Sequence, residues 1–185
     1  MPPCYAPHAT LATMPNDVDR LRTARIAYTD MHPRVAAAEP WRLAVAFGTE
    51  PEADWGPREV LAHVAEMLPY WLGELERVVD GTPGGADGAA VPFGRVADDP
   101  IRLGFIERDR TLPLRVLFGR IDAGLRDWND RLGTLSNEER ACPGRHAKLG
   151  ELRAGEILER FVIGHAEDHV EQLESIVAER ANSPR

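Results

Sequence analysis

Apolar residues recur every three or four positions over long stretches of the chain, and no stretch alternates apolar and polar residues for long. The first spacing is typical of amphipathic helices, and its dominance argues against a sheet. It predicts helices at about 16–33 with a kinked continuation to 39, at 57–80, at 112–132 with a start as early as 106, and at 152–180. Four such helices suit a bundle with one common core, so the predicted fold class is all-α, a four-helix bundle with long inter-helix loops.

Capping and helix-breaking residues set these boundaries. Asn16 or Asp17 can cap the first helix, and Pro57 stands in the first turn of the second. The segments 40–56 and 81–100 are rich in glycine and proline, which predicts loops. A loop as long as 81–100 is usually functional, so we expect it to cover the mouth of a site.

The length of 185 residues fits one domain, which we place at 16–181 between an irregular leader at 1–15 and a tail at 182–185. The leader lacks the basic and apolar blocks of a secretory signal. No apolar run approaches the roughly 20 residues of a membrane span. We therefore expect a cytoplasmic protein without a membrane partner.

Charge and cysteine content exclude further classes. The net charge is −8, and no stripe of basic residues with interleaved aromatics offsets it, which argues against nucleic-acid binding. The two cysteines are Cys4 in the leader and Cys142 in a Cys-Pro-Gly turn, too few for a disulfide framework. We expect Cys142 to be a solvated loop thiol rather than a nucleophile.

Two histidines share the apolar face of the last predicted helix. At about 100° per residue from Phe161, His165 falls near 40° and His169 near 80°, on the stripe that contains Leu158. Side chains at i and i+4 stand side by side, so both imidazoles can reach one metal ion. The alternative is a pair of core histidines that are hydrogen-bonded to polar neighbours.

His63 is the candidate for a third ligand. It lies at the edge of the apolar stripe of the second predicted helix. The alternative is a boundary histidine that is half solvated and paired with Glu59 or Tyr70. The pattern on this helix leaves both readings open.

Three motifs resemble those of a known family. Residues 55–64, Trp-Gly-Pro-Arg-Glu-Val-Leu-Ala-His-Val, are similar to the stretch that opens the second helix of DinB-like proteins and ends in their first metal-binding histidine. Residues 165–173, His-Ala-Glu-Asp-His-Val-Glu-Gln-Leu, resemble the closing motif of that family. Arg145-His146 and 150–152, Gly-Glu-Leu, resemble the turn before the last helix. Together the motifs cover about 18–178 in the family's order.

The resemblance implies a DinB-like four-helix bundle in which His63, His165 and His169 bind one divalent metal ion, zinc or nickel. The superfamily includes transferases that use a low-molecular-weight thiol such as mycothiol or bacillithiol, as well as members described as hydrolases. The expected function is therefore a metal-dependent transferase with a small-molecule substrate. His146 is expected to be a turn or rim residue rather than a fourth ligand.

Helical spacing also suggests which residues surround the metal. Glu59, Glu66, Asp168 and Gln172 are candidates to orient the imidazoles by hydrogen bonds. Trp55, Met67, Tyr70 and Trp71 could line an apolar pocket, although aromatic residues on a helix more often belong to the core.

Two other functions compete with a thiol transferase. The metal could stabilise a non-catalytic bundle or a homodimer interface, with the 81–100 loop recruiting a partner, or the ion could serve a hydrolase. A bundle without any metal is the third reading. Closed coordination and unfolding on chelation would indicate a structural metal, whereas an exchangeable position would indicate catalysis.

Overall fold

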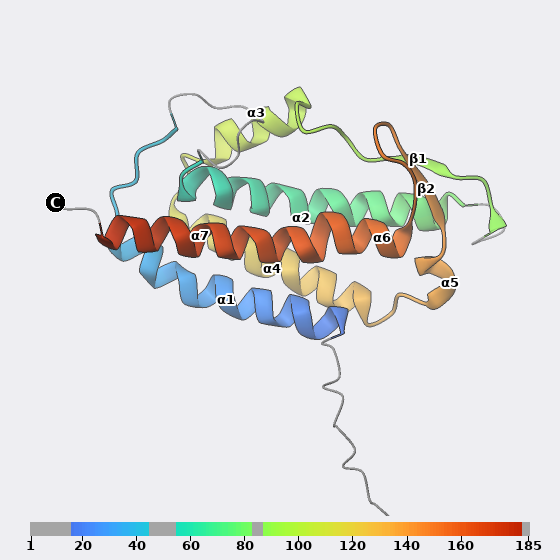
Figure 1. Ribbon diagram of the computed structural model, residues 1–185, viewed down its shortest axis with the longest axis horizontal. Helices are drawn as coiled ribbons and strands as arrows, with labels where there is room; N and C mark the ends of the chain where they lie inside the picture. The colour runs from blue at the N-terminus through green and yellow to red at the C-terminus, as the bar shows by residue number, and fades with distance from the viewer. Residues whose placement is uncertain (1–15, 45–54, 83–86, 183–185) are drawn as a thin grey trace, which may run out of the picture.

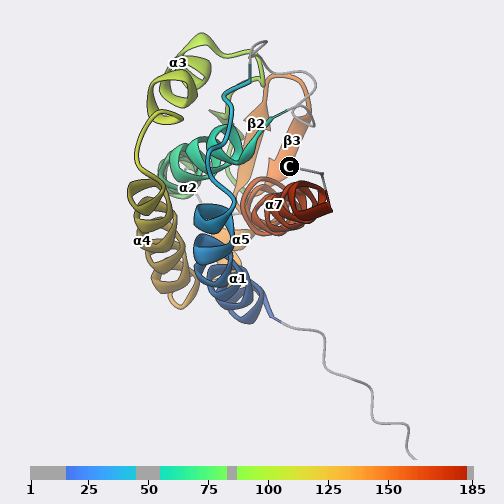
Figure 2. The ribbon, with the colours of Figure 1, turned by 90° about the vertical axis from the view of Figure 1, so that its left-hand side faces the viewer.

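The structure is a computed structural model that describes residues 16–44, 55–82 and 87–182. These residues are mostly helical, and four long helices lie side by side in Figure 1, α1 (Asp17–Ala37), α2 (Pro57–Asp80), α4 (Leu114–Leu132) and α7 (Gly164–Asn182). Helix α1 contacts α4 and α7, and α2 contacts the same two helices. Figure 2 shows the shorter helix α3 (Pro100–Asp109) on the side of α2 that faces away from α1. The predicted leader at 1–15 with Cys4, and the tail beyond residue 182, lie outside the described residues.

Capping residues place the first two long helices where the sequence predicts them. The side-chain oxygen of Asn16 accepts a hydrogen bond from the Asp19 amide at 2.9 Å, and Pro57 stands at the start of α2. Both arrangements suit the first turn of a helix, whose amides have no partner within the helix. Helix α1 continues through Pro33 to Ala37, close to the longer of its two predicted endings.

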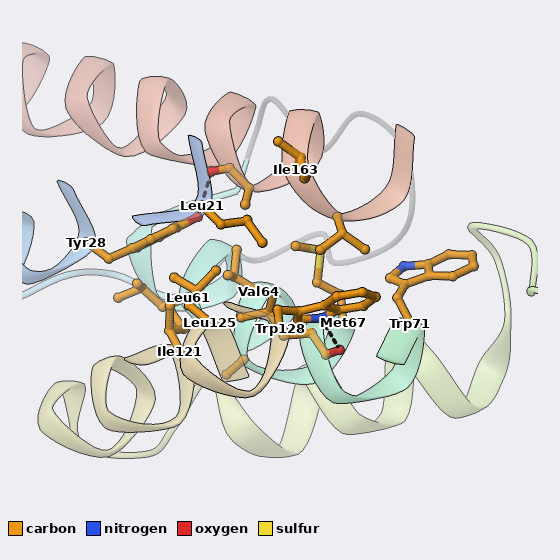
Figure 3. Close-up of a cluster of buried hydrophobic side chains, with 14 of the residues drawn as sticks. Leu21, Tyr28, Leu61, Val64, Met67, Trp71, Ile121, Leu125, Trp128 and Ile163 are labelled. Atoms are coloured by element: carbon orange, nitrogen blue, oxygen red, sulfur yellow. Dashed lines mark hydrogen bonds between the residues drawn. The ribbon is translucent and has the colours of Figure 1, made fainter. Parts of the chain in front are cut away.

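The core lies between the long helices, and Figure 3 shows side chains of α1, α2 and α4 together with Ile163, which directly precedes α7. Tyr28 and Trp128 are buried, and the polar atom of each has a hydrogen-bond partner on another helix. Trp128 Nε1 donates to the carbonyl of Leu68 at 2.9 Å, and the Tyr28 hydroxyl donates to the carbonyl of Ala166 at 3.1 Å. These bonds satisfy groups that would be costly to bury alone, and they tie α4 to α2 and α1 to α7.

A small three-stranded sheet corrects the expectation of a purely helical chain. Strand β1 (Val91–Phe93) pairs in parallel with β2 (Pro143–His146), which pairs in antiparallel fashion with β3 (Gly150–Arg153). Strands of three or four residues are too short to show an alternating pattern in the sequence. Gly150, with φ of 75°, closes the β2–β3 turn in a conformation that favours glycine. The segment 81–100 is therefore not one continuous loop, although 83–86 lie outside the described residues.

The third predicted helix is divided in two. Asp99 caps α3 by accepting from the Arg102 amide at 2.9 Å, and α3 ends at Asp109. A separate helix, α4, begins after Pro113, because a proline disfavours the helical conformation of the residue before it. The earlier start near Ile106 therefore belongs to another element.

The last predicted helix is interrupted as well. It starts later than predicted, because 152–153 belong to β3, and it runs through α6 (Ala154–Leu158) and a π-helical segment, η3 (Glu159–Ile163), into α7. The connection from α4 also contains the single turn α5 (Asn137–Arg140). No helix of the described part of the chain is long and apolar enough to cross a membrane.

Candidate metal centre

Three histidines from α2 and α7 meet in the interior. His63 is 3% exposed, His169 is 5% exposed, and His165 is half-buried. One ring nitrogen from each residue lies within 4.8 Å of the other two. The structure thus brings together the three predicted ligands, and this cluster could hold a metal ion.

The ring nitrogens of the cluster face one another. Nε2 of His165 lies 2.9 Å from Nε2 of His63 and 2.9 Å from Nε2 of His169. On the far side of His169, Nδ1 lies 2.8 Å from the Gln172 side-chain oxygen. Because that oxygen accepts, Nδ1 of His169 donates the proton and its Nε2 presents a lone pair to the cluster.

Without a metal ion, three neutral imidazoles cannot make a full hydrogen bond at each of these nitrogen–nitrogen contacts. If Nε2 of His165 accepts a proton from His63, two lone pairs face each other between His165 and His169. If it donates instead, a single proton serves both contacts as a shared and weaker bond. A cation among the three nitrogens would attract every lone pair, and imidazole ligands suit zinc and nickel. The donor set therefore fits a divalent metal ion.

Burial keeps the imidazoles of His63 and His165 neutral. It lowers the pKa of His63 well below the usual range, and the neighbouring His169 and Arg102 lower it further. Burial likewise lowers the pKa of His165 to about 3, again with contributions from His169 and Arg102. Since only a deprotonated nitrogen binds a metal, both residues are available as ligands at neutral pH.

The same shift predicts acid sensitivity of the metal-free protein. A histidine whose pKa falls on folding binds a proton more readily in the unfolded chain, so the free energy of unfolding decreases as the pH falls. For His165 the loss begins near its ordinary pKa of 6.5 and continues to about pH 3. We expect the stability of wild type relative to His165→Gln to fall by on the order of 1 kcal/mol per pH unit. Urea denaturation in the presence of a chelator, at pH 7 and pH 5, measures this difference, and a constant difference would contradict the prediction.

The π-helical segment η3 directly precedes the two histidines of α7. A π-helical turn contains an extra residue relative to an α-helix, and such turns are frequent at functional sites. Phe161, within η3, stacks on Trp71 of α2 with ring centroids 4.2 Å apart and an interplanar angle of 17°. The aromatic contact thus anchors η3 on α2 just before the chain reaches His165.

Arg102 is a neighbour of the cluster that the sequence analysis missed. It lies on α3, is 5% exposed, and one of its terminal nitrogens is 3.4 Å from Nδ1 of His63. It also donates to the carbonyl of Ala97 at 2.9 Å. The signal that could have found it is Asp99-Pro100, a capping residue followed by proline, which predicts a helix start and places Arg102 in its first turn.

Of the other predicted neighbours, Gln172 is the one that contacts the cluster. Glu59 is fully buried, but its carboxylate accepts from the Ala44 amide at 2.9 Å and from Arg110 at 3.0 Å. Glu66 pairs with Arg95 at 2.5 Å, and the Arg95 guanidinium lies 3.7 Å from the Tyr70 ring centroid. Asp168 is exposed. Within the described residues, the side chains of Glu59, Glu66, Tyr70 and Asp168 make no hydrogen bond to a histidine of the cluster.

The four residues that were predicted to line an apolar pocket divide between the core and a cavity. Trp55, Met67 and Trp71 are buried, and the Trp55 ring meets His63 edge-on with centroids 5.6 Å apart. Tyr70 is half-buried and lines a cavity between α2, α3 and α4.

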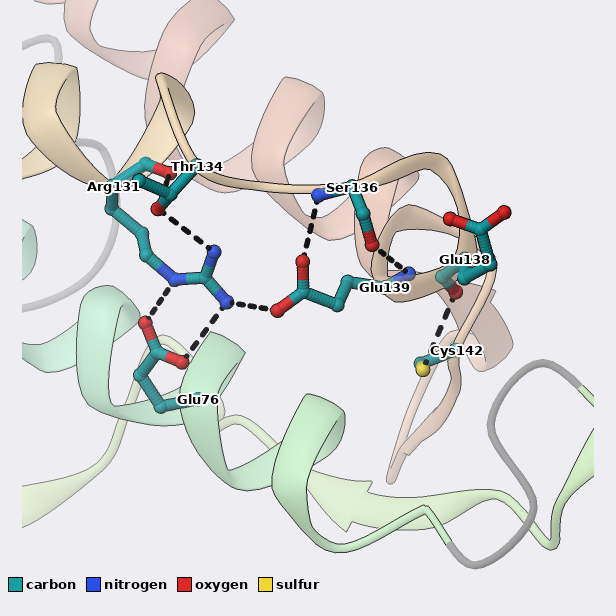
Figure 4. Close-up of polar contacts among 7 residues, drawn as sticks. All are labelled: Glu76, Arg131, Thr134, Ser136, Glu138, Glu139 and Cys142. Carbon is teal, nitrogen blue, oxygen red and sulfur yellow. Dashed lines mark hydrogen bonds and ion pairs between the residues drawn. The ribbon is translucent and has the colours of Figure 1, made fainter.

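Cys142 and His146 both have structural environments. Cys142 is 3% exposed and donates to the carbonyl of Glu138 at 3.6 Å (Figure 4), which corrects the expectation of a solvated thiol. His146 is buried at the end of β2 rather than on a loop rim. Its Nδ1 accepts from the amides of Lys148 at 3.2 Å and Leu149 at 3.3 Å, so this histidine holds the β2–β3 turn.

Comparison with known proteins adds no name to this site. No family model, curated protein or solved structure matches the chain.

Proposed function

We propose that this chain is a DinB-like four-helix bundle that binds one divalent metal ion, zinc or nickel, through His63, His165 and His169 and acts as a thiol-dependent transferase. The observation that carries the proposal is the convergence of three imidazole nitrogens within 4.8 Å in the interior. The packing of α1 and α2 against both α4 and α7 supports the bundle. The family motifs supply the ligand-bearing histidines on α2 and α7.

Two neighbours of the cluster, Gln172 and Arg102, bear on what it can bind. When bound, a divalent ion acts as a Lewis acid that lowers the pKa of a thiol or a water molecule. The side-chain oxygen of Gln172 lies 2.8 Å from Nδ1 of His169, and this contact leaves Nε2 of His169 facing the cluster. The Arg102 guanidinium adds positive charge beside His63, which favours a negatively charged group such as a thiolate nearby.

The proposed reaction transfers a low-molecular-weight thiol, such as mycothiol or bacillithiol, to an electrophile. The thiol loses its proton to solvent, its sulfur forms a bond to an electrophilic carbon, and the leaving group departs with its electron pair. His63, His165 and His169 would hold the ion with three protein ligands, the number that is typical of catalytic zinc sites.

Transfer of each thiol to 1-chloro-2,4-dinitrobenzene, followed by absorbance, tests this function on protein purified without added metal. We expect about one ion per chain by elemental analysis and turnover with at least one thiol. His169→Ala should lose both. The matched control is His32→Ala, which removes a histidine of α1 that packs against Phe118 in a tilted arrangement with ring centroids 4.6 Å apart, outside the cluster.

The other outcomes identify the competing functions. Bound metal without turnover of either thiol would contradict the transferase and favour a metal-stabilised binding protein. Hydrolysis of a p-nitrophenyl ester in place of thiol transfer would favour a hydrolase. Absence of metal after reconstitution would refute the metal site.

A further inference from the structure

A second concave site lies between α2, α3 and α4. The cavity has a volume of about 800 Å³, and none of the three clustered histidines lines it. Its lining includes small or apolar residues from all three helices, namely Ala65, Pro69, Ile101, Phe105, Ala123 and Gly124. Ile101 is 67% exposed and Phe105 is 38% exposed, so apolar surface at this site faces solvent. A cavity of this size with apolar walls is typical of sites for small organic ligands.

One end of the cavity carries surplus positive charge. Asp109, which is 5% exposed, accepts from Arg108 at 2.6 and 2.9 Å and from Arg120 at 2.8 Å. Two guanidinium groups thus share one carboxylate. The Arg108 and Arg120 side chains are 61% and 46% exposed, so both can also meet an anionic group of a ligand.

The other charged residues that line the cavity differ in whether they are paired with each other. Glu66 and Arg95 neutralise each other in a pair whose side chains are 9% and 10% exposed. The Asp127 carboxylate makes no ion pair or hydrogen bond with any residue that the structure describes, and Asp127 follows Arg120 by seven positions on α4. Seven residues are two turns, so Arg120 and Asp127 lie on one face of α4, about 10 Å apart. Asp99, at the start of α3, adds another carboxylate to the lining.

We propose that this cavity binds a short zwitterionic peptide of about three residues with an apolar middle side chain. Its carboxylate would meet Arg108 and Arg120, its ammonium group would meet Asp127, and its side chain would pack between Phe105 and Ala123. An extended chain spans about 3.3–3.6 Å per residue, so three residues match the helix rise between positions 120 and 127 of α4. The inference is independent of the metal centre, because it uses none of the cluster residues.

Isothermal titration calorimetry of the full chain with Ala-Phe-Ala tests the proposal. We expect saturable binding that weakens about threefold when the peptide is N-acetylated or C-amidated, since each change removes one partly exposed ion pair. Asp127→Asn should weaken binding of the free peptide by the same factor but leave binding of the N-acetylated peptide unchanged. Arg120→Gln should likewise weaken binding of the free peptide and leave binding of the C-amidated peptide unchanged. The control Asp130→Asn removes an exposed carboxylate of α4 outside the cavity lining and should change nothing.

A cavity-filling variant tests the location separately from the charges. Ala123→Trp should weaken binding about tenfold or more, because the peptide side chain loses its buried position. Unchanged thermal unfolding would show that this variant still folds. No saturable binding up to about 10 mM peptide would overturn the proposal. Binding that is indifferent to capping of the peptide or to Ala123→Trp would overturn it as well.

Discussion

Replacing His165 or His169 by alanine is expected to weaken zinc binding by roughly a hundredfold to a thousandfold. Zinc sites with four protein ligands bind with about 10–16 kcal/mol, so one ligand contributes about 2.5–4 kcal/mol, which is about two to three orders of magnitude. Competition with a chelating dye measures the affinity. Circular dichroism should show nearly unchanged helical content, because the cluster lies between helices that also share an apolar core.

The choice of control makes this result specific. His146→Ala also removes a buried histidine, but one whose Nδ1 binds backbone amides of the β2–β3 turn. It should lower stability and leave zinc affinity unchanged. Stoichiometric zinc of wild-type affinity in both cluster variants would refute the three-histidine site.

Replacing Arg110 by methionine is expected to lower the free energy of unfolding by about 3–5 kcal/mol. Glu59 is fully buried, and Arg110 donates to it at 3.0 Å while also donating to the Ala44 carbonyl at 3.0 Å. The variant would leave the Glu59 carboxylate buried without this cation. Urea denaturation at pH 7 measures the loss.

Two further variants separate the buried charge from a general effect of losing an arginine. The double variant Glu59→Met and Arg110→Met removes both charges and should recover most of the loss. Arg145→Met breaks an ion pair with Glu151 whose side chains are 62% and 58% exposed, and it should cost less than about 1 kcal/mol. A loss in the double variant as large as in Arg110→Met would show that the buried carboxylate is not the cause.

Long amphipathic segments were predictable because each repeats its pattern over several turns. Helix α2 spans Pro57–Asp80 as expected, since proline at its start and glycine after its end mark both boundaries. The proximity of His165 and His169 followed from their spacing on one helix. That His63 joins them depends on how α2 packs against α7, which no local pattern contains, and the family resemblance supplied that expectation.

The features that could not be predicted from the sequence depend on contacts between distant segments of the chain. The strands of the small sheet are three or four residues long and pair residues around 91–93 with 143–146, so neither strand has a signal of its own. Glu59 lies one turn from His63 and was expected beside it, yet its carboxylate turns to Arg110, fifty-one positions away. Arg102 reaches His63 only because α3 packs on α2.

The π-helical segment Glu159–Ile163 also bears on how this chain should be aligned with others. A π-helical turn is equivalent to one residue inserted into a regular helix. A homologue without it would reach the same place in the fold with one residue fewer between Leu158 and His165. Alignments of this helix should therefore allow a single-residue gap there. Without the gap, every position before the segment would be aligned with the wrong residue of the homologue.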